Sequence, residues 1–300
     1  MHARWLAAAA AVWLVIACGR TESRSDSAAA THVDGNGQAP PVLLAAGDIA
    51  SCQSQGDEAT ARLLDSLPGT VLALGDNVYR HGSMDEYRQC YEPSWGRHRA
   101  RTRPTLGNHE YYVRGAAPYF AYFGEAAGPA GKGYYSFDVG GWHVVSLNSN
   151  IDARAGSPQE RWLRTDLAAH PVRCTLAFWH AARFSSGGKH GSTAAVGPLW
   201  RALYEADADV IVEAHDHLYE RIAPLAPDGR VDAARGMRSF IVGTGGGGEH
   251  HVFGPILAAS EARYNDGPGL LKLTLSGDGY AWEFIAAPGV VRDRGAGNCH

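Results

Sequence analysis

Residues 70–77 read Thr-Val-Leu-Ala-Leu-Gly-Asp-Asn, an apolar strand-like run that ends abruptly in polar residues. The same pattern, an apolar run closed by a short polar block, recurs along the chain. The blocks are Gly47-Asp48, Gly75-Asp76-Asn77, Gly107-Asn108-His109-Glu110, Trp179-His180 and His215-Asp216-His217. In an α/β sheet, ligands gather outside the carboxyl ends of the strands. We therefore predict that these strand ends bring Asp, Asn and His side chains to one edge, as in a metal centre.

The bulk composition suits one large α/β domain, or two small ones, with a substantial core. Of the 300 residues, 45% are hydrophobic and only 19% are charged, which argues against a coiled coil or a disordered chain. The formal net charge is −4, so the chain lacks the basic footprint of a nucleic-acid-binding protein.

The first 17 residues are typical of an export signal. Met1–Arg4 supplies a basic start, and the apolar run from Trp5 to Ala17 is too short to span a membrane. The run ends Val-Ile-Ala-Cys, which resembles a bacterial lipobox, so we expect Cys18 to be the lipidated first residue of a cell-envelope lipoprotein. An ordinary signal peptide, giving a periplasmic or secreted protein, is the alternative. Residues 18–40 are expected to form a flexible linker.

Four cysteines follow Cys18, and an exported chain permits disulfides. Four cysteines allow three pairings. We favour Cys52 with Cys90, which both follow predicted site strands, and Cys174 with Cys299, which would tie the C-terminal tail to a strand. Zinc binding by these cysteines is disfavoured because the chain has no Cys-x-x-Cys pair.

The elements between the polar blocks are expected to alternate between strand and helix. Gly140-Gly141 predicts a hairpin turn between two strands, and the C-terminal third is expected to be β-rich, with strands at 239–242, 270–275 and 280–286. Helices are predicted after an N-cap at Asp57, at the capping-box sequences beginning with Ser83 and Ser157, and from Pro198 to Ala206.

The donor types in the blocks suit particular metals. A carboxylate between two cations can bridge them, and Asp, Asn and His donors suit iron, zinc or manganese rather than calcium. Two metals about 3.5–4 Å apart can activate a water and stabilise the leaving oxygen of a displacement. The chemistry expected at this edge is therefore metal-assisted hydrolysis.

In this order the blocks resemble those of the calcineurin-like metallophosphoesterase superfamily. They follow one another at intervals of 28, 32, 72 and 35 residues, and the resemblance runs from about Val42 to Gly248. It implies a four-layer α/β/β/α sandwich with two mixed sheets between helices. The metallophosphoesterase domain is then expected at 41–288, with a C-terminal tail at 289–300.

Two details narrow the resemblance to the purple acid phosphatases. Many superfamily members carry a His two residues after the first Asp, where this chain has Ala50. Purple acid phosphatases lack that His and carry a Tyr three residues after the bridging Asp, which corresponds to Tyr79 here. The resemblance therefore implies that Tyr79 is a metal ligand; the alternative is an aromatic residue of the core or rim.

The resemblance implies two ligand sets that share Asp76. The first metal would be held by Asp48, Asp76, Tyr79 and His217. The second would be held by Asp76, Asn108, His180 and His215. A phenolate favours iron at the first position, and the family's second metal is iron, zinc or manganese. One departure is Ala214, where the family usually has Gly; its methyl is tolerated at negative φ and costs about 1 kcal/mol or more at positive φ.

The resemblance also implies roles beyond the metal ligands. His109 would donate a proton to the phosphate or leaving group, with Asn108 also touching substrate, and Glu110 would orient His109 or bind metal-bound water indirectly. His190, ten residues after His180, has the spacing of a second substrate-side His and would be a general acid; the alternative is a solvated loop residue. Arg183 is a candidate for binding phosphate oxygens, with a structural salt bridge as the alternative.

The sequence supports only weaker predictions for a glycine-rich run and for a pair of histidines that follows it. The run Gly243-Thr244-Gly245-Gly246-Gly247-Gly248 is not a P-loop, because it lacks the Lys-Ser/Thr ending and a following helix. We expect it to let the backbone pass close to the metal pocket. His250 and His251 are expected to be exposed loop residues, with a position at the rim of the pocket as the alternative.

The expected function is exported, metal-dependent hydrolysis of phosphate monoesters by a metal-bound hydroxide, with a small phosphate ester as the partner. The first alternative is a phosphodiesterase or nucleotidase of the same superfamily, although the missing His at position 50 argues against the cyclic-nucleotide type. The second is a lipoprotein that binds metal or phosphate without turnover, although the intact His109 argues against it. No protein partner is implied, and a membrane is involved only through the N-terminal lipid anchor.

Overall fold

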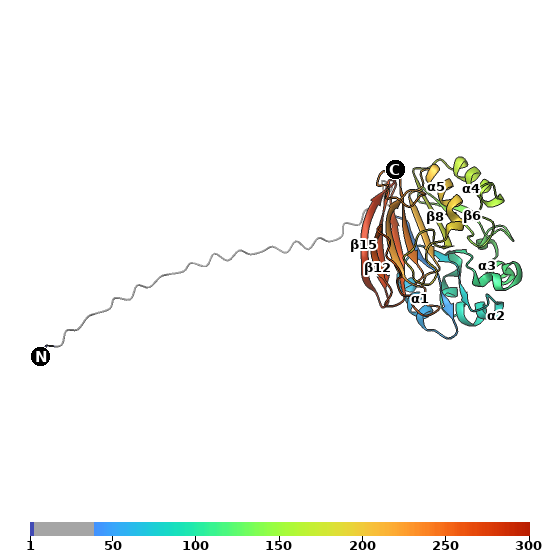
Figure 1. The fold of residues 1–300 in the computed structure, drawn as a ribbon. Coiled ribbons are helices and arrows are strands. Elements are labelled where there is room, and N and C mark those ends of the chain that lie inside the picture. Colours follow the sequence, from blue (N-terminus) through green and yellow to red (C-terminus); the bar gives the residue numbers. More distant parts are fainter. Residues whose placement is uncertain (3–38) are drawn as a thin grey trace.

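The computed structural model describes Met1–His2 and residues 39–300 (Figure 1). The predicted signal peptide, Cys18 and nearly all of the predicted linker lie outside the described residues. Within the described part, no helix has the length and apolar character needed to cross a membrane.

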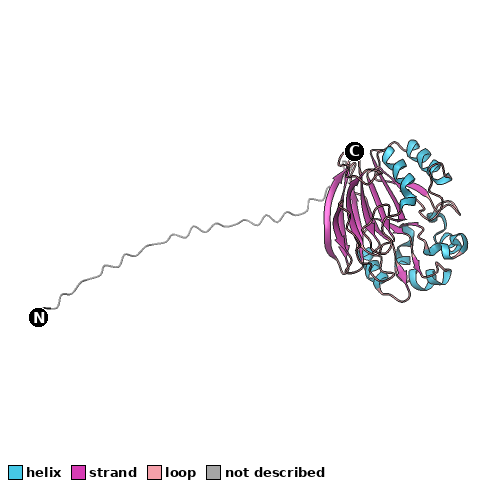
Figure 2. Cartoon of the chain, viewed as in Figure 1, coloured by secondary structure: helices cyan, strands magenta, loops and turns pink. Residues whose placement is uncertain are grey.

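Two mixed sheets are packed against each other between helices (Figure 2), which confirms the predicted sandwich. The first sheet has the order β15-β14-β13-β1-β3-β5. Its strands are β1 (Val42–Ala46), β3 (Thr70–Leu74), β5 (Thr102–Thr105), β13 (Gly269–Leu275), β14 (Gly279–Ala286) and β15 (Val290–Asn298). The three strands that lead into polar blocks, β1, β3 and β5, are parallel, so their carboxyl ends share one edge.

The second sheet has the order β12-β10-β11-β9-β8-β7-β6. Its strands are β6 (Tyr135–Val139), β7 (Trp142–Ser146), β8 (Cys174–Ala181), β9 (Val210–Ala214), β10 (Tyr219–Leu225), β11 (Met237–Val242) and β12 (Ser260–Tyr264). Strands β7, β8, β9 and β11 are parallel. A small parallel pair, β2 (Ala50–Ser51) with β4 (Val78–Tyr79), extends the loops after β1 and β3 toward the same edge.

The central strands are buried along almost their whole length, as parallel strands covered on both faces must be. Leu44 and Leu72 of the first sheet and Phe178 and Val212 of the second belong to one continuous apolar cluster between the layers. This buried packing fixes the register of both sheets and therefore the position of every strand end.

Helices cover the outer faces of both sheets. On the second sheet, α4 (Pro158–Ala169) and α5 (Gly197–Glu205) bury Leu163 and Leu203 in a second apolar cluster; the two helices lie side by side in Figure 1. The first sheet is covered by segments that precede β6. These are α1 (Gly56–Ser66), α2 (Met84–Glu86), the π-helical turn η1 (Tyr87–Tyr91), the 3-10 helix η2 (Trp95–Arg101) and α3 (Ala117–Phe123).

The helix starts agree with the prediction in two cases and correct it in one. Ser83 forms the full capping box with Glu86, and the Ser157 side chain accepts a hydrogen bond from the Glu160 N–H. Asp57, however, is not an N-cap. Helix α1 begins at Gly56 after Gln55, which makes no side-chain cap hydrogen bond, and Asp57 is buried in the first turn.

The segment 289–300, predicted to be a C-terminal tail, is mostly strand. Residues 290–298 form β15, which pairs antiparallel with β14 at the edge of the first sheet. Its side chains are half-buried or exposed along its whole length. The segment therefore lacks the alternation of apolar and polar residues from which a strand is predicted. Strands β10 and β12 were also not predicted.

Both favoured disulfide pairings are present. Cys52 is bonded to Cys90 and Cys174 to Cys299. The second bond joins the end of β15 to the start of β8, and so links the C-terminal segment of the first sheet to the second sheet.

Candidate metal centre

The five polar blocks meet at one edge of the sandwich. Asp48 follows β1, Asp76 follows β3, His180 lies near the end of β8, and His215 follows β9. Asp48, Asp76 and His215 have positive φ angles of 59°, 46° and 75°. Such backbone strain costs of order 1–3 kcal/mol per residue, and it accumulates at functional sites. The strand ends therefore hold these side chains in a geometry that the chain would not adopt on its own.

Three of the predicted ligands converge on the hydroxyl of a fourth, Tyr79. Its Oη donates a hydrogen bond of 2.7 Å to Asp48 Oδ1, and it lies 3.2 Å from Asp76 Oδ2 and 3.0 Å from His217 Nε2. Burial and the Asp48 and Asp76 carboxylates raise the pKa of Tyr79 well above its usual range. A phenolate at this position thus requires a cation that offsets the two carboxylates.

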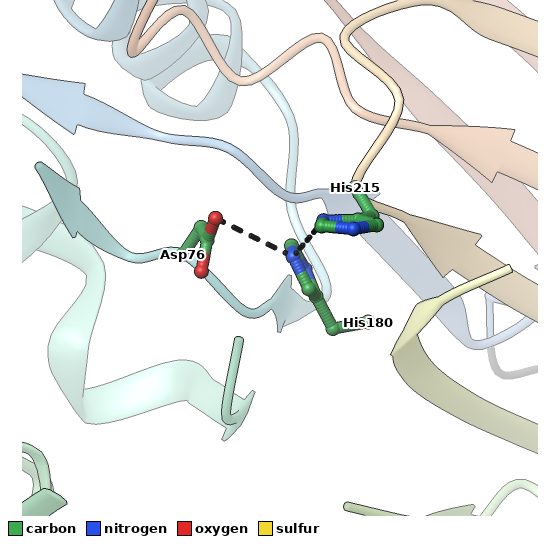
Figure 3. A group of neighbouring side chains, drawn as sticks. All are labelled: Asp76, His180 and His215. Atoms are coloured by element: carbon green, nitrogen blue, oxygen red, sulfur yellow. Dashed lines mark hydrogen bonds and ion pairs between the residues drawn. The ribbon is translucent and has the colours of Figure 1, made fainter. Parts of the chain in front are cut away.

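The remaining ligands form a second group around Asp76 (Figure 3). His180 Nε2 lies 3.4 Å from Asp76 Oδ2 and 3.0 Å from His215 Nδ1. Each of these three residues offers a ligand atom within 4.8 Å of the others. The side-chain oxygen of Asn108 is buried and has no hydrogen-bond partner among the described residues. The next residue, His109, donates its backbone N–H to Asp76 Oδ1 at 2.9 Å, so Asn108 lies next in the chain to a contact with this group, and an orphaned oxygen there suits a fourth, hard-oxygen ligand.

The ring nitrogens that face away from the site are held by the backbone. His180 Nδ1 lies 2.8 Å from the Leu74 carbonyl oxygen, and His217 Nδ1 lies 2.9 Å from that of Glu249. These carbonyls accept from N–H groups, so each Nε2 is left with its lone pair turned into the site. This is how metal-ligating histidines are normally oriented.

The local charges also fit a cation. Burial opposes protonation of His180, but the Asp76 carboxylate outweighs it and raises the pKa of His180 to about 10. Burial and the neighbouring His180 lower the pKa of His215 to about 3. A proton on His180 would thus take the place that a metal ion can occupy among these carboxylates.

Glu110 supports the site through the backbone. Its buried carboxylate accepts hydrogen bonds from the N–H groups of Gly107 (2.7 Å), Asn77 (2.8 Å) and Asp76 (3.1 Å). Burial, reinforced by the Asp76 charge, raises the pKa of Glu110 to about 7. Glu110 therefore ties the loop after β3 to the loop after β5 rather than contacting the His109 ring.

His109 lies between the buried ligands and solvent. Its Nδ1 is 2.6 Å from the Arg80 carbonyl oxygen, which turns Nε2 toward Asp76, 3.8 Å from Oδ2. The ring packs edge-on against Tyr79, with 4.5 Å between the centroids. The side chain is 22% exposed, so when the ring carries a proton on both nitrogens its Nε2–H can meet a group that enters from solvent.

The structure brings His190 to the site. The His190 ring stacks on His215 with 3.8 Å between centroids, and burial lowers its pKa. Arg183 is not brought to the site. Its guanidinium lies 4.3 Å from the centre of the Phe184 ring and beside Gly197 of α5.

Two residues of the site were not assigned from the sequence. Asp216 is buried and accepts hydrogen bonds from Ser185 Oγ (2.8 Å) and from the backbone N–H of His190 (3.1 Å), so it anchors the loop that carries His190. His251, predicted to be exposed, is instead buried and stacked on His217, with 4.1 Å between centroids. The position of Asp216 between two predicted ligands is the only sequence signal for it, and for His251 a position at the pocket rim is the alternative prediction.

The glycine-rich run passes close to the ligands, as expected. A Cβ at Gly247 would lie 2.5 Å from the Tyr79 ring, and one at Gly243 would lie 2.7 Å from Asp48 Oδ2. Ala214 belongs to β9 and is not among the residues with positive φ, so its methyl is tolerated. A Cβ at position 47 would lie 2.6 Å from the Cβ of Ala214. Ala214 is therefore compatible only with glycine at position 47.

Comparison with known families defines the class of the protein. Residues 41–219 match the calcineurin-like phosphoesterase family model, and the chain belongs to this family.

Its curated relatives include purple acid phosphatases. Purple acid phosphatase 18 of Arabidopsis thaliana is 27% identical over 237 residues, which cover 71% of this chain and 51% of the relative. Purple acid phosphatase 15 of the same plant is 26% identical over 218 residues, covering 61% and 41%. The chain therefore spans about half the length, or less, of these curated relatives.

Solved structures share the fold. Purple acid phosphatase PPD1 from yellow lupin seeds superposes with a TM-score of 0.70 at 20% identity, covering 85% of this chain and 53% of that one. GAP50, described as the anchor in the inner membrane complex of Plasmodium, gives a TM-score of 0.68 at 15% identity, covering 87% and 89%.

Proposed function

We propose that the protein is an exported phosphatase that hydrolyses small phosphate monoesters at a dinuclear metal centre. The observation that carries this proposal is the convergence of Asp48, Asp76 and His217 on the Tyr79 hydroxyl. This donor set is the one that distinguishes purple acid phosphatases from other members of the family. The purple acid phosphatases named above support the proposed phosphatase activity. The preference for monoesters is a further proposal that these relatives do not establish.

The ligands are proposed to divide into two sets that share Asp76. Asp48, Tyr79 and His217 complete the first, and Asn108, His180 and His215 complete the second. We propose iron at the first position, because a phenolate ligand favours it, and iron, zinc or manganese at the second. When bound, such a metal pair supplies an activated water and stabilises charge on the phosphoryl group.

The chain's own residues are proposed to position the substrate and move a proton. The orphaned Asn108 oxygen belongs to the residue directly before His109, whose Nε2 lies 3.8 Å from Asp76 Oδ2. An N–H at His109 Nε2 stabilises charge on the phosphoryl oxygens and can protonate the departing alkoxide. His190, stacked on His215, is the second candidate for that proton. The position of Arg183 against Phe184 gives no support to a role in phosphate binding.

The decisive experiment measures phosphate release from an aryl phosphate together with the metal content of each variant. Asp76→Asn and His180→Ala should lose essentially all activity and at least one metal per chain. Asp278→Asn, in the exposed turn between β13 and β14, is the control and should match the wild type. Wild-type turnover by either site variant would refute the two-metal assignment. A parallel assay with a phosphodiester tests the monoester preference.

Export and lipid anchoring are part of the proposal. Two disulfides in the described residues support an oxidising compartment, since such bonds are rare in the cytosol. Cys18→Ala should move the protein from the membrane fraction to the soluble fraction of the expressing cells. An unchanged distribution would leave export by an ordinary signal peptide.

A further inference from the structure

Tyr112 is an aromatic residue in an unusual position. Its side chain is 64% exposed. No other Phe, Trp or Tyr among the described residues has a largely exposed side chain. The adjacent Tyr111 is different: it is half-buried, and its hydroxyl accepts a hydrogen bond of 2.7 Å from Asn148. A fold that covers its other aromatic rings leaves this one in water.

The exposed ring lies beside the proposed proton donor. Tyr112 ends the 3-10 helix η3 (His109–Tyr112), in which residues three apart lie above one another. The rings of His109 and Tyr112 meet edge to face, with 4.9 Å between centroids and an interplanar angle of 72°. His109 in turn contacts Tyr79 at 4.5 Å. The three rings thus form a row that leads from the metal ligands outward to solvent.

The row determines what a leaving group would touch. A phosphate that receives a proton from His109 Nε2 has its ester oxygen at that nitrogen. The organic group on that oxygen must extend away from the buried carboxylates and toward solvent. On the His109 side, the next ring outward is that of Tyr112, which is exposed to solvent. An aromatic ring in that position would gain an offset-stacked or edge-to-face contact, whereas a saturated group would gain less.

We propose that Tyr112 is a leaving-group platform, so that the site prefers phosphate monoesters whose leaving group carries a planar aromatic ring near the ester oxygen. This inference rests on the phosphatase activity proposed above and names a substrate class for it. Tyr112 acts on substrate binding and specificity, and it takes no part in the proton transfer itself.

The test compares benzyl phosphate with cyclohexylmethyl phosphate. Both leave as primary alkoxides of similar size, so the two substrates differ chiefly in the planarity of the ring. The wild type should prefer benzyl phosphate by about tenfold in kcat/KM, the ratio expected when one aromatic contact is worth about 1.4 kcal/mol. Tyr112→Ala should remove most of this preference through KM, while kcat/KM for cyclohexylmethyl phosphate changes less than about twofold.

Tyr112→Phe is the matched control, because it keeps the ring and should keep the preference. An equal fall of both substrates in Tyr112→Ala would overturn the platform and assign Tyr112 to the support of His109. A wild type that hydrolyses both esters equally would also overturn it. A wild type that hydrolyses neither refutes the phosphatase itself, so the two failures are distinguishable.

A binding measurement gives a readout independent of turnover. Phenylphosphonate and cyclohexylphosphonate cannot be hydrolysed, and their affinities for the metal-loaded protein can be measured by calorimetry. The aromatic phosphonate should bind about tenfold more tightly to the wild type and to Tyr112→Phe, and this difference should shrink in Tyr112→Ala. Equal affinities for the wild type would contradict the proposal.

Discussion

The hydroxyl oxygen of Tyr79 is the atom at which the proposed ligands of the first metal meet. This Oη lies within 3.2 Å of Asp48, Asp76 and His217, two of which are carboxylates that oppose loss of the phenolic proton. Only a strongly polarising cation can convert that hydroxyl into a ligand.

Replacing Tyr79 by Phe should therefore remove the visible absorption band of the iron-loaded protein. A tyrosinate bound to ferric iron absorbs visible light, so the wild type should be coloured when loaded with iron, and Tyr79→Phe should lose the band. The measurement is a visible spectrum with metal analysis on the same samples. A band that persists in Tyr79→Phe, or a colourless protein that contains zinc or manganese only, would contradict iron–tyrosinate ligation.

Glu110 should matter for stability as well as for the site. Glu110→Gln replaces one of two acceptor oxygens by a donor, so at least one N–H of Gly107, Asp76 or Asn77 loses its partner. The expected loss is about 1–3 kcal/mol in the free energy of unfolding, measured by urea denaturation of the metal-free protein. The exposed Glu205→Gln is the control. A loss equal to that of the control would show that the three contacts are not stabilising.

At the residue level, the prediction of the site rests on the chemistry of short sequence motifs. Most of the predicted ligands lie at or shortly after the end of an apolar strand, so the strand ends alone indicated a metal centre, whereas Tyr79 and the division into two ligand sets came from the resemblance to the family. His251 could not be inferred, because its burial depends on the segment after Gly248 folding back over His217, a contact 34 residues apart in the chain. The position of Arg183 could not be inferred for a related reason: a residue past a strand end can turn to either face.

Among the elements, the hairpin of β6 and β7 carries a second polar cluster at the sheet end opposite the ligands. His143 of β7 is buried between two carboxylates, 2.8 Å from Asp138 of β6 and 2.9 Å from Asp166 of α4. His170, after α4, stacks on its ring at 4.2 Å. Burial opposes protonation of His143, but the hydrogen bonds to Asp166 and Asp138 outweigh it and raise its pKa.

This cluster predicts a pH dependence of stability. Because the folded pKa of His143 is above its unfolded value of about 6.5, its stabilising contribution is complete below that pH. It is lost as the pH rises through the folded pKa. His143→Gln should therefore destabilise the protein more at pH 6 than at pH 9, by about 1–3 kcal/mol at the lower pH. Urea unfolding at both pH values measures this, with the exposed His81→Gln as control; a loss independent of pH would contradict it.

The element predictions succeeded where one local rule decided the outcome. Strands β1, β3, β8 and β9 are buried on both faces and therefore read as continuous apolar runs. Strand β15 lies at a sheet edge, where pairing with β14 suffices and the side chains stay polar, so composition gave no signal. The start of α1 depends on the loop before it rather than on the nearest Asp.

At the scale of the whole molecule, two covalent links restrict the unfolded chain to different extents. The Cys174–Cys299 bond joins residues 125 apart, and the Cys52–Cys90 bond joins residues 38 apart. In the chain-entropy description, the longer loop stabilises more, by roughly 1 kcal/mol for this difference. Its removal also frees β15 from β8.

The double variant Cys174→Ser/Cys299→Ser should therefore lose more stability than Cys52→Ser/Cys90→Ser. The expected cost of the first is about 4–5 kcal/mol, read from the urea midpoint under oxidising conditions. Both variants should match the wild type once all three are fully reduced. The opposite order of stability would show that local packing around Cys52 outweighs loop length.

The positive φ angles at Asp48, Asp76 and His215 set two requirements of the fold against each other. Glycine would sit at each position without strain, so replacement by glycine relaxes the backbone while it removes a ligand. Two of these side chains also accept backbone hydrogen bonds, Asp48 Oδ2 from the His215 N–H and Asp76 Oδ1 from the His109 N–H. Glycine at position 48 or 76 would leave that N–H without its partner, which costs about as much as the strain that is relieved. The fold can therefore lose these ligands at little net cost in stability.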